Sequence, residues 1–277
     1  MVRQIMHQVS LHSRIFISLM VLLAALSAVQ LGRTGYFSPA LSWLVNSSRD
    51  AGLVLQKLSI TGANKTTVAD IRQVLDVDMG MPLVAMDLDS LRTRIESLKW
   101  VQSVKLRRQF PDTLMIDLIE RKPAALWQHQ GVVTLVDRMG VSITREKLAD
   151  YADFLLIVGE NAHKNYAEIM SILDSQPALK AKVQSAIYIG NRRWDIVFGT
   201  GMRLRLPEID STEKGQGRYS AFDPKTAQGA FARFARLEAE YQILSREIAV
   251  VDLRGEKLII QLTPAGKKRM NKNTIYS

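Results

Sequence analysis

Residues 100–123 read WVQSVKLRRQFPDTLMIDLIERKP and decide how the first folded module is built. Apolar and polar residues alternate on both sides of Pro111-Asp112. Alternation is typical of strands with one buried face, and a Pro-Asp pair is typical of a turn. The stretch therefore predicts two neighbouring strands joined by a short turn. The alternating apolar residues are Val104, Leu106, Leu114, Ile116 and Leu118.

The residues before this hairpin predict one more strand and two helices. Residues 58–60 alternate in the same way. Thr67 and Asp70 have the spacing of a capping box, and Asp87 is placed to cap a second helix. The order over residues 53–122 is therefore β-α-α-β-β, a small α+β module with helices over one face of its sheet.

Residues 123–265 predict a second, strand-rich β domain with flanking helices. Short apolar runs alternate there with glycine-containing turns. The polar residues 208–228 are expected to form a mobile surface loop, and residues 266–277 a basic flexible tail. We predict helices at 166–173 and 227–246, and closing strands at 248–253 and 258–262.

The N-terminal region contains the strongest apolar run of the chain. Residues 15–32 carry no charge, and about 18 helical residues cover about 26 Å, near the thickness of a bilayer core. We predict a transmembrane helix at 15–34, after a tail at 1–14 and before a juxtamembrane linker at 35–52. A signal peptide cleaved near the small residues 25–28 and a buried core helix are the alternatives. Charge alone does not set the orientation; the short tail favours a cytoplasmic N-terminus.

Composition narrows the chemistry that the chain can perform. There are no cysteines among the 277 residues, which excludes disulfides, thiolate metal sites and a cysteine nucleophile. The net charge of +10 permits an acidic partner without selecting its class.

No motif in the sequence predicts catalysis, a metal site or a bound cofactor. The four histidines lack metal-ligand spacing, and the glycine pairs lack the context of a phosphate-binding loop. Asp76, Asp78 and Asp87 superficially resemble a calcium loop, but Pro82 interrupts it; a helix-ending turn and a helix cap explain them better. Basic residues at 105–108 are interpreted as a solvated strand face, so we expect no nucleic-acid binding. No small-molecule substrate is expected either.

Several short motifs, taken in order, resemble the FtsQ/DivIB family of bacterial cell-division proteins. That resemblance covers residues 36–262 and implies a single-span membrane protein with a POTRA domain followed by a β domain. An insertion at 208–228 departs from the family, as does Gly255, where some relatives have Tyr. The matching motifs are Trp100-Val101, Phe110-Pro111-Asp112-Thr113-Leu114, Glu120-Arg121-Lys122-Pro123-Ala124, Leu135-Val136-Asp137-Arg138, Arg192-Arg193-Trp194-Asp195 and Val251-Asp252-Leu253-Arg254.

The resemblance implies a non-enzymatic scaffold of the bacterial division machinery. Such a protein forms a complex with FtsB and FtsL, links early and late division proteins, and concentrates at the septum. It is anchored in inner-membrane lipid by one span, with its bulk in the periplasm. Two other classes stay open from the sequence: a POTRA-type component of protein transport or outer-membrane assembly, and a periplasmic enzyme.

The resemblance also implies where the partner binds. Relatives receive a segment of FtsB by strand addition on the last strand and the helix before it. The last strand is followed by Pro264 and so is expected at a sheet edge. Arg254 is expected to pair with an acidic partner residue; the alternative is that Arg254 merely caps its own turn and that the tail covers the edge. The implied binding residues are Tyr241, Arg254, Gly255, Lys257, Leu258, Ile259, Ile260 and Gln261.

Overall fold

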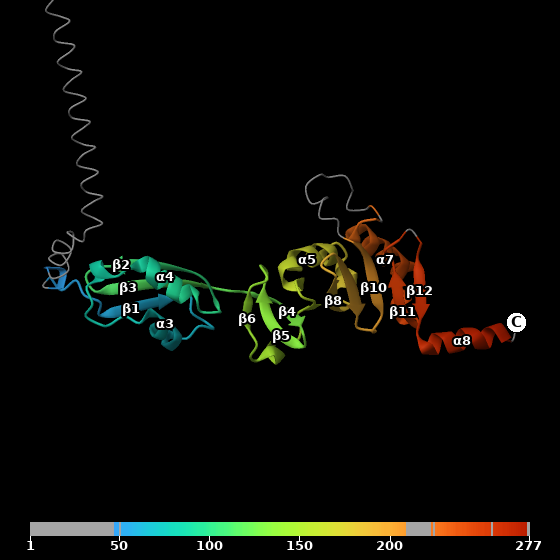
Figure 1. Cartoon of the computed structure of the whole chain (residues 1–277), viewed down its shortest axis with the longest axis horizontal. Coiled ribbons are helices and arrows are strands. Elements are labelled where there is room, and N and C mark those ends of the chain that lie inside the picture. The colour runs from blue at the N-terminus through green and yellow to red at the C-terminus, as the bar shows by residue number, and fades with distance from the viewer. Residues whose placement is uncertain (1–46, 50, 209–222, 224, 256, 276–277) are drawn as a thin grey trace, which may run out of the picture. The chain divides into compact units, whose positions relative to one another are not determined.

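The computed structural model describes residues 47–49, 51–208, 223, 225–255 and 257–275 (Figure 1). The chain divides into two compact units near residues 99–120. The predicted membrane segment at 15–34 and its cytoplasmic tail lie outside the described residues. Within the described part, no helix is both long and apolar enough to cross a membrane.

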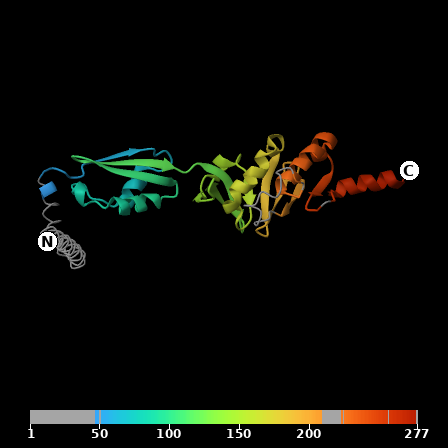
Figure 2. The ribbon, with the colours of Figure 1, turned by 90° about the horizontal axis from the view of Figure 1, so that it is seen from above.

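The first unit has the predicted β-α-α-β-β order, which is confirmed. Its three strands are arranged β1-β3-β2, with β1 parallel to β3. Helices α3 and α4 pack together on one face of this sheet (Figure 2). The elements are β1 (Lys57–Thr61), α3 (Val68–Leu75), the 3-10 helix η1 (Leu83–Ala85), α4 (Leu88–Glu96), β2 (Val101–Gln109) and β3 (Thr113–Glu120).

The helix caps of this unit are those that the sequence predicts. Thr67 accepts from the Asp70 N–H, and Asp70 in turn accepts from the Thr67 N–H, a complete capping box. Asp87 accepts from the N–H groups of the first turn of α4. Asp76 is the left-handed residue that ends α3, so the interpretation of Asp76 as a helix end and of Asp87 as a cap is confirmed.

The basic residues of β2 are tied into the first unit. Arg107 pairs with Asp117 at 2.8 Å, while Arg108 donates to the Leu83 and Met86 carbonyls. The hydrogen bonds from Thr61 and Arg107 hold the pKa of the Asp117 carboxyl below its ordinary value. Arg107 thus lies on a solvated face as predicted, whereas Arg108 anchors the loop before α4.

The second unit is built on a nine-stranded sheet. Its order is β12-β11-β10-β9-β8-β7-β4-β5-β6, so β12 and β6 are the two edges. The strands are β4 (Pro123–His129), β5 (Val132–Asp137), β6 (Ser142–Thr144), β7 (Leu156–Val158), β8 (Val183–Ile189), β9 (Arg193–Phe198), β10 (Arg203–Glu208), β11 (Ile248–Asp252) and β12 (Ile259–Leu262). The helices are η2 (Leu148–Tyr151), η3 (Ala162–Asn165), α5 (Tyr166–Asp174), α6 (Pro177–Lys180), α7 (Ala227–Tyr241), η4 (Ile243–Ser245) and α8 (Pro264–Ile275).

One face of this sheet packs against α5 and α7 to form the core. Trp194, Phe198, Phe231 and Phe234 are fully buried there. Trp194 also donates its indole N–H to Glu168 at 2.8 Å, which satisfies its polar atom. The core therefore fixes which side chains of β9, β10 and β11 point inward and which point to the opposite, open face.

Three predictions about segments after residue 200 need correction. The long helix ends at Tyr241 rather than at 246, because Gln242 takes the left-handed conformation and ends it. The expected loop 208–228 is shorter, since Glu208 closes β10 and α7 begins at Ala227. Residues 209–222 of that loop lie outside the described residues.

The third correction concerns the expected flexible tail at 266–277, because its described residues through Ile275 belong to helix α8. Thr263 acts as the cap, because its hydroxyl accepts from the Gly266 N–H at 3.2 Å. Pro264 occupies the first helical position, where its missing N–H costs no hydrogen bond. The basic composition of the tail did not reveal this start signal.

Candidate partner-binding edge

The last strand of the chain lies at one edge of the nine-stranded sheet, as the sequence predicts. β12 pairs on one side with β11, in antiparallel register from Asp252 opposite Ile259 to Ile248 opposite Leu262. No described strand lies on its other side. The backbone groups that face outward from β12 are therefore available to another chain.

The hydrogen bonds of β11 show which residue of β12 presents those groups. The Leu253 N–H donates to the Arg205 carbonyl of β10, so every second residue of β11, including Val251, faces β10. The residues of β11 that alternate with these direct their backbone groups to β12, where their partners are Gln261 and Ile259. Ile260 lies between these two partners, so its N–H and C=O point to the open edge.

The Thr263 N–H supports this assignment from the other end of the strand. It donates inward to the Glu247 carbonyl at 2.9 Å. Counting back in steps of two gives Gln261 and Ile259 as inward-facing again and Ile260 as outward-facing.

The side chains of β12 divide between the two faces of the sheet. Leu258 and Leu262 pack against the core, on the side of Val251, while Ile259 shares the open face with Asp252. Ile259 is 54% exposed and Ile260 is 43% exposed. Two adjacent isoleucines that are each about half exposed give the edge an apolar surface on both sides.

The turn after β11 is held by Arg254 and Asp252. The Arg254 guanidinium donates to both carboxylate oxygens of Asp252, at 2.9 Å and 3.0 Å from Nε, and its backbone N–H donates to the same carboxylate. These hydrogen bonds lower the pKa of the Asp252 carboxyl. Arg254 therefore does cap its own turn, yet its side chain is 42% exposed beside the edge.

Further arginines lie behind this turn on the open face of the sheet. Arg205 reaches Asp252 at 3.5 Å, and Arg193 and Arg203 lie within 4.0 Å of Asp195. The Asp195 side chain is 3% exposed, and burial raises its pKa despite these arginines. Four guanidinium groups thus share two carboxylates, which leaves the region around Arg254 positively charged.

The family to which this chain belongs follows from its similarity to known proteins. The model of the FtsQ-type POTRA domain matches residues 53–121, and the model of the cell division protein FtsQ/DivIB C-terminal region matches residues 125–254. A cell division protein FtsQ from Rhizobium radiobacter is 30% identical over 206 residues, 74% of this chain and 90% of that protein. The chain belongs to the FtsQ/DivIB family.

Two longer relatives are matched by this chain over only part of their length. The cell division proteins FtsQ of Zymomonas mobilis and Novosphingobium aromaticivorans are 28% and 30% identical over 80% and 78% of this chain. The matched regions span 66% and 63% of those two proteins, just under two thirds of their length. Both relatives are named cell division proteins, and the FtsQ/DivIB family is one of non-enzymatic division proteins.

The structure brings most of the residues that are predicted to bind the partner to one edge of the sheet. Arg254, Gly255, Lys257 and Leu258 form the connection from β11 into β12. Tyr241 is the last residue of α7 and is 46% exposed. Its carbonyl accepts from the Arg246 side chain at 2.7 Å, which ties the end of α7 to the segment that leads into β11.

Sequence reasoning missed the arginines of β9 and β10 as part of this region. Arg193, Arg203 and Arg205 alternate with buried residues of their strands, and this spacing was the available signal. The sequence did not reveal that β10 pairs in parallel with β11, which brings Arg205 beside Asp252.

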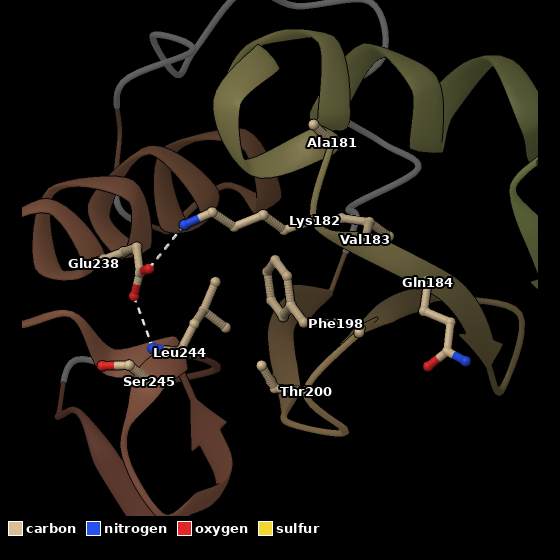
Figure 3. A pocket seen from close by; sticks show the side chains of 10 residues that line it. Ala181, Lys182, Val183, Gln184, Phe198, Thr200, Glu238, Leu244 and Ser245 are labelled. Atoms are coloured by element: carbon tan, nitrogen blue, oxygen red, sulfur yellow. Dashed lines mark hydrogen bonds and ion pairs between the residues drawn. The ribbon is translucent and has the colours of Figure 1, made fainter.

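A cleft of about 570 Å³ lies at the C-terminal end of α7 (Figure 3). Its apolar lining includes Phe198 and Leu244. Glu238 accepts from Lys182 at 3.1 Å and from the Leu244 N–H at 2.8 Å, so the charged groups of the cleft pair with each other. Among the described residues, no three His, Asp or Glu side chains are grouped to hold a metal ion.

Proposed function

We propose that this FtsQ-family chain is a non-enzymatic scaffold that links early and late division proteins at the septum through a complex with FtsB and FtsL. One span at 15–34 anchors it in inner-membrane lipid. Residues 1–14 are cytoplasmic, and everything after about residue 35 is periplasmic. Family membership and the two family domains in their expected order support this function.

The partner segment, from FtsB, adds to β12 as a tenth strand. The single observation that carries this proposal is the outward direction of the Ile260 N–H and C=O. Main-chain hydrogen bonds set the register of the added strand, and its side chains meet Ile259 on one face and Ile260 on the other. Four strand residues give a short template, so contacts at both ends of β12 complete the interface.

Arg254 supplies a charge contact beside this template. Its guanidinium is shared with Asp252, but the surplus of arginines on the open face keeps the region positive. An acidic partner side chain can therefore pair with Arg254 without displacing Asp252. Tyr241, Gly255 and Lys257 border the same edge and complete the proposed contact surface.

Co-purification from membranes tests this function. Full-length parent chain and the Arg254→Glu and Ile260→Pro variants are each produced with tagged FtsB and FtsL. We expect the parent to retain FtsB, Arg254→Glu to retain less, and Ile260→Pro to retain none. If both variants fold and retain FtsB like the parent, the binding site lies elsewhere.

Localisation and topology are tested separately. A fluorescent fusion should form a mid-cell band in growing cells, and a uniform envelope signal would contradict the division role. The mature protein should begin at its original N-terminus. A mature sequence beginning near Ala28 would show that the apolar run is a cleaved signal peptide.

A further inference from the structure

Helix α8 directly follows the edge strand and is held against the sheet at its first turn. The Thr263 N–H donates to the Glu247 carbonyl at 2.9 Å, and Arg269 pairs with the Glu247 carboxylate at 3.1 Å. α8 therefore starts from a fixed point beside β11 rather than hanging freely from β12.

Gly266 allows this close attachment. A Cβ atom at this position would lie 2.8 Å from the Glu247 carbonyl oxygen and 3.3 Å from the Leu262 Cβ. Both neighbours belong to the sheet or its border, so a larger residue has to move the helix away. The glycine thus sets the direction in which α8 leaves the domain.

That direction is the one in which the sheet would grow. In Figure 1, α8 continues beyond β12 on the side away from β11. A strand added to β12 would consequently pass beside the first turns of α8.

The exposed side chains of those turns are basic. Lys267, Lys268 and Arg269 are all exposed, and Arg269 is the one that pairs with Glu247. No ion pair within the described part of the chain includes Lys267 or Lys268. The sequence of α8, PAGKKRMNKNTI, contains no acidic residue.

From this geometry we propose that α8 is a basic platform for the added strand and binds acidic side chains at one end of it. The proposal rests on the proposed strand addition at β12. Arg254 precedes β12 and Lys267 and Lys268 follow it, so positive charge flanks the template at both ends. The partner segment that fits is extended and apolar over about four to six residues, with acidic residues at both ends.

The composition of α8 favours this partner over a lipid surface. A helix that lies in a membrane interface needs a broad apolar face opposite its basic one. Met270 and Ile275 are the large apolar residues of α8, too few for such a face. Anionic lipid is therefore kept as an outcome of the test.

The test measures the affinity of the full-length chain, in detergent micelles, for the soluble extracytoplasmic part of FtsB. The variant is Lys267→Glu with Lys268→Glu. The matched control is Lys147→Glu with Lys164→Glu, two exposed lysines near the β6 edge. We expect the α8 variant to bind about tenfold more weakly at low salt and the control to bind like the parent. At about 0.5 M salt, parent and variant should agree within about twofold.

Two more variants separate this inference from the proposed function. Gly266→Ala keeps every charge but displaces α8, and we expect a loss of affinity of about fivefold. If Ile260→Pro abolishes binding while the α8 double variant and Gly266→Ala bind like the parent, strand addition stands and the platform is wrong. If Ile260→Pro binds normally, the strand-addition proposal itself fails. If the α8 variant loses binding only to phosphatidylglycerol vesicles, the helix serves lipid and the inference is overturned.

Discussion

The two edges of the nine-stranded sheet begin alike and end differently. In each case the neighbouring strand ends in a buried aspartate, Asp137 in β5 and Asp252 in β11. Each aspartate pairs with arginine, Asp137 with Arg121 at 2.8 Å and Asp252 with Arg254 at 2.6 Å. The two edges differ in how the chain continues after the aspartate.

At the β6 edge the chain completes the structure by itself. Asp137 accepts from the Met139 and Val141 N–H groups, both at 2.9 Å, so backbone donors fill its turn. β6 has three residues, and its central Ile143 is fully buried. A short edge strand with a buried apolar residue offers little template to another chain.

At the β12 edge the chain leaves apolar and charged groups exposed. Arg254 stays partly exposed, and Ile259 and Ile260 are about half exposed. A buried aspartate thus ends the strand next to each edge strand, but one edge is closed by the chain itself and the other is left open to pairing. Exposure of apolar residues, rather than the aspartate, distinguishes the β12 edge, which we propose as the binding edge.

The largest effect is expected from Ile260→Pro. Proline removes the outward N–H that an added strand would use, so affinity for FtsB should fall by about a hundredfold. The side chain alone is tested by Ile260→Thr, which keeps the N–H and should bind within about threefold of the parent. Affinity is measured by fluorescence anisotropy with labelled FtsB.

Gln261→Pro is the control for direction within the strand. Its N–H faces β11, so this variant should lower the melting temperature of the β domain, whereas Ile260→Pro should not. Equal loss of stability in both variants would contradict the assigned directions.

The second effect contrasts the two edges in stability. Ile143→Ala should lower the free energy of unfolding of the β domain by about 2.5 kcal/mol, because it leaves a cavity. Ile259→Ala should lower it by less than about 1 kcal/mol. Urea titration followed by the fluorescence of buried Trp194 measures both. Similar losses would mean that β12 is as closed as β6.

The third effect concerns the charge at the open edge. Arg254→Glu should weaken FtsB binding about thirtyfold, or about 2 kcal/mol, since it places a negative charge opposite the acidic side chain of the partner. Lys147→Glu near the β6 edge should leave affinity unchanged. Arg254→Lys keeps the charge but loses the two-pronged geometry, and we expect an intermediate affinity.

The smallest effect is the pH dependence that Asp252 confers. The hydrogen bonds from Arg254 lower the pKa of the Asp252 carboxyl below its value in the unfolded chain, which is about 3.9. The ionised carboxylate therefore contributes its full stabilisation of the fold above that pH. Stabilisation is lost as the pH falls through the folded pKa. Asp252→Asn should therefore lower the free energy of unfolding by about 1 kcal/mol at pH 7 and by less at about pH 2.

Asp195 provides the opposite sign for comparison. Burial raises its pKa, so its carboxylate disfavours the folded state increasingly as the pH rises through that value. The difference in free energy of unfolding between the parent and Asp195→Asn should therefore change with pH in the opposite direction to the difference between the parent and Asp252→Asn. Parallel pH profiles for the two variants, from calorimetric melting curves, would contradict the assigned causes.

Local rules in the sequence are sufficient for the first unit and for the edge strand. The capping box at Thr67, the cap at Asp87 and the alternation around Pro111 are each read from neighbours within four residues. The edge position of β12 is predictable because Pro264 stops the strand. These features depend on short-range physics that a single sequence displays.

Long-range pairing explains what the sequence does not show. The parallel pairs of β4 with β7 and β10 with β11 join segments far apart in the chain. That pairing is what places Arg205 beside Asp252 and gives the open face its charge. The helical tail is a different case, because its basic composition predicts a flexible segment, whereas Gly266 permits close packing against Glu247.

Amide hydrogen exchange at Ile260 tests the open edge most directly. The full-length chain is compared with and without saturating FtsB, and exchange is followed for single amides of β12 and β6. Strand addition predicts that the Ile260 amide becomes strongly protected on binding, while the Ser142 and Thr144 amides do not change. An Ile260 amide that exchanges equally fast in the saturated complex would contradict the account.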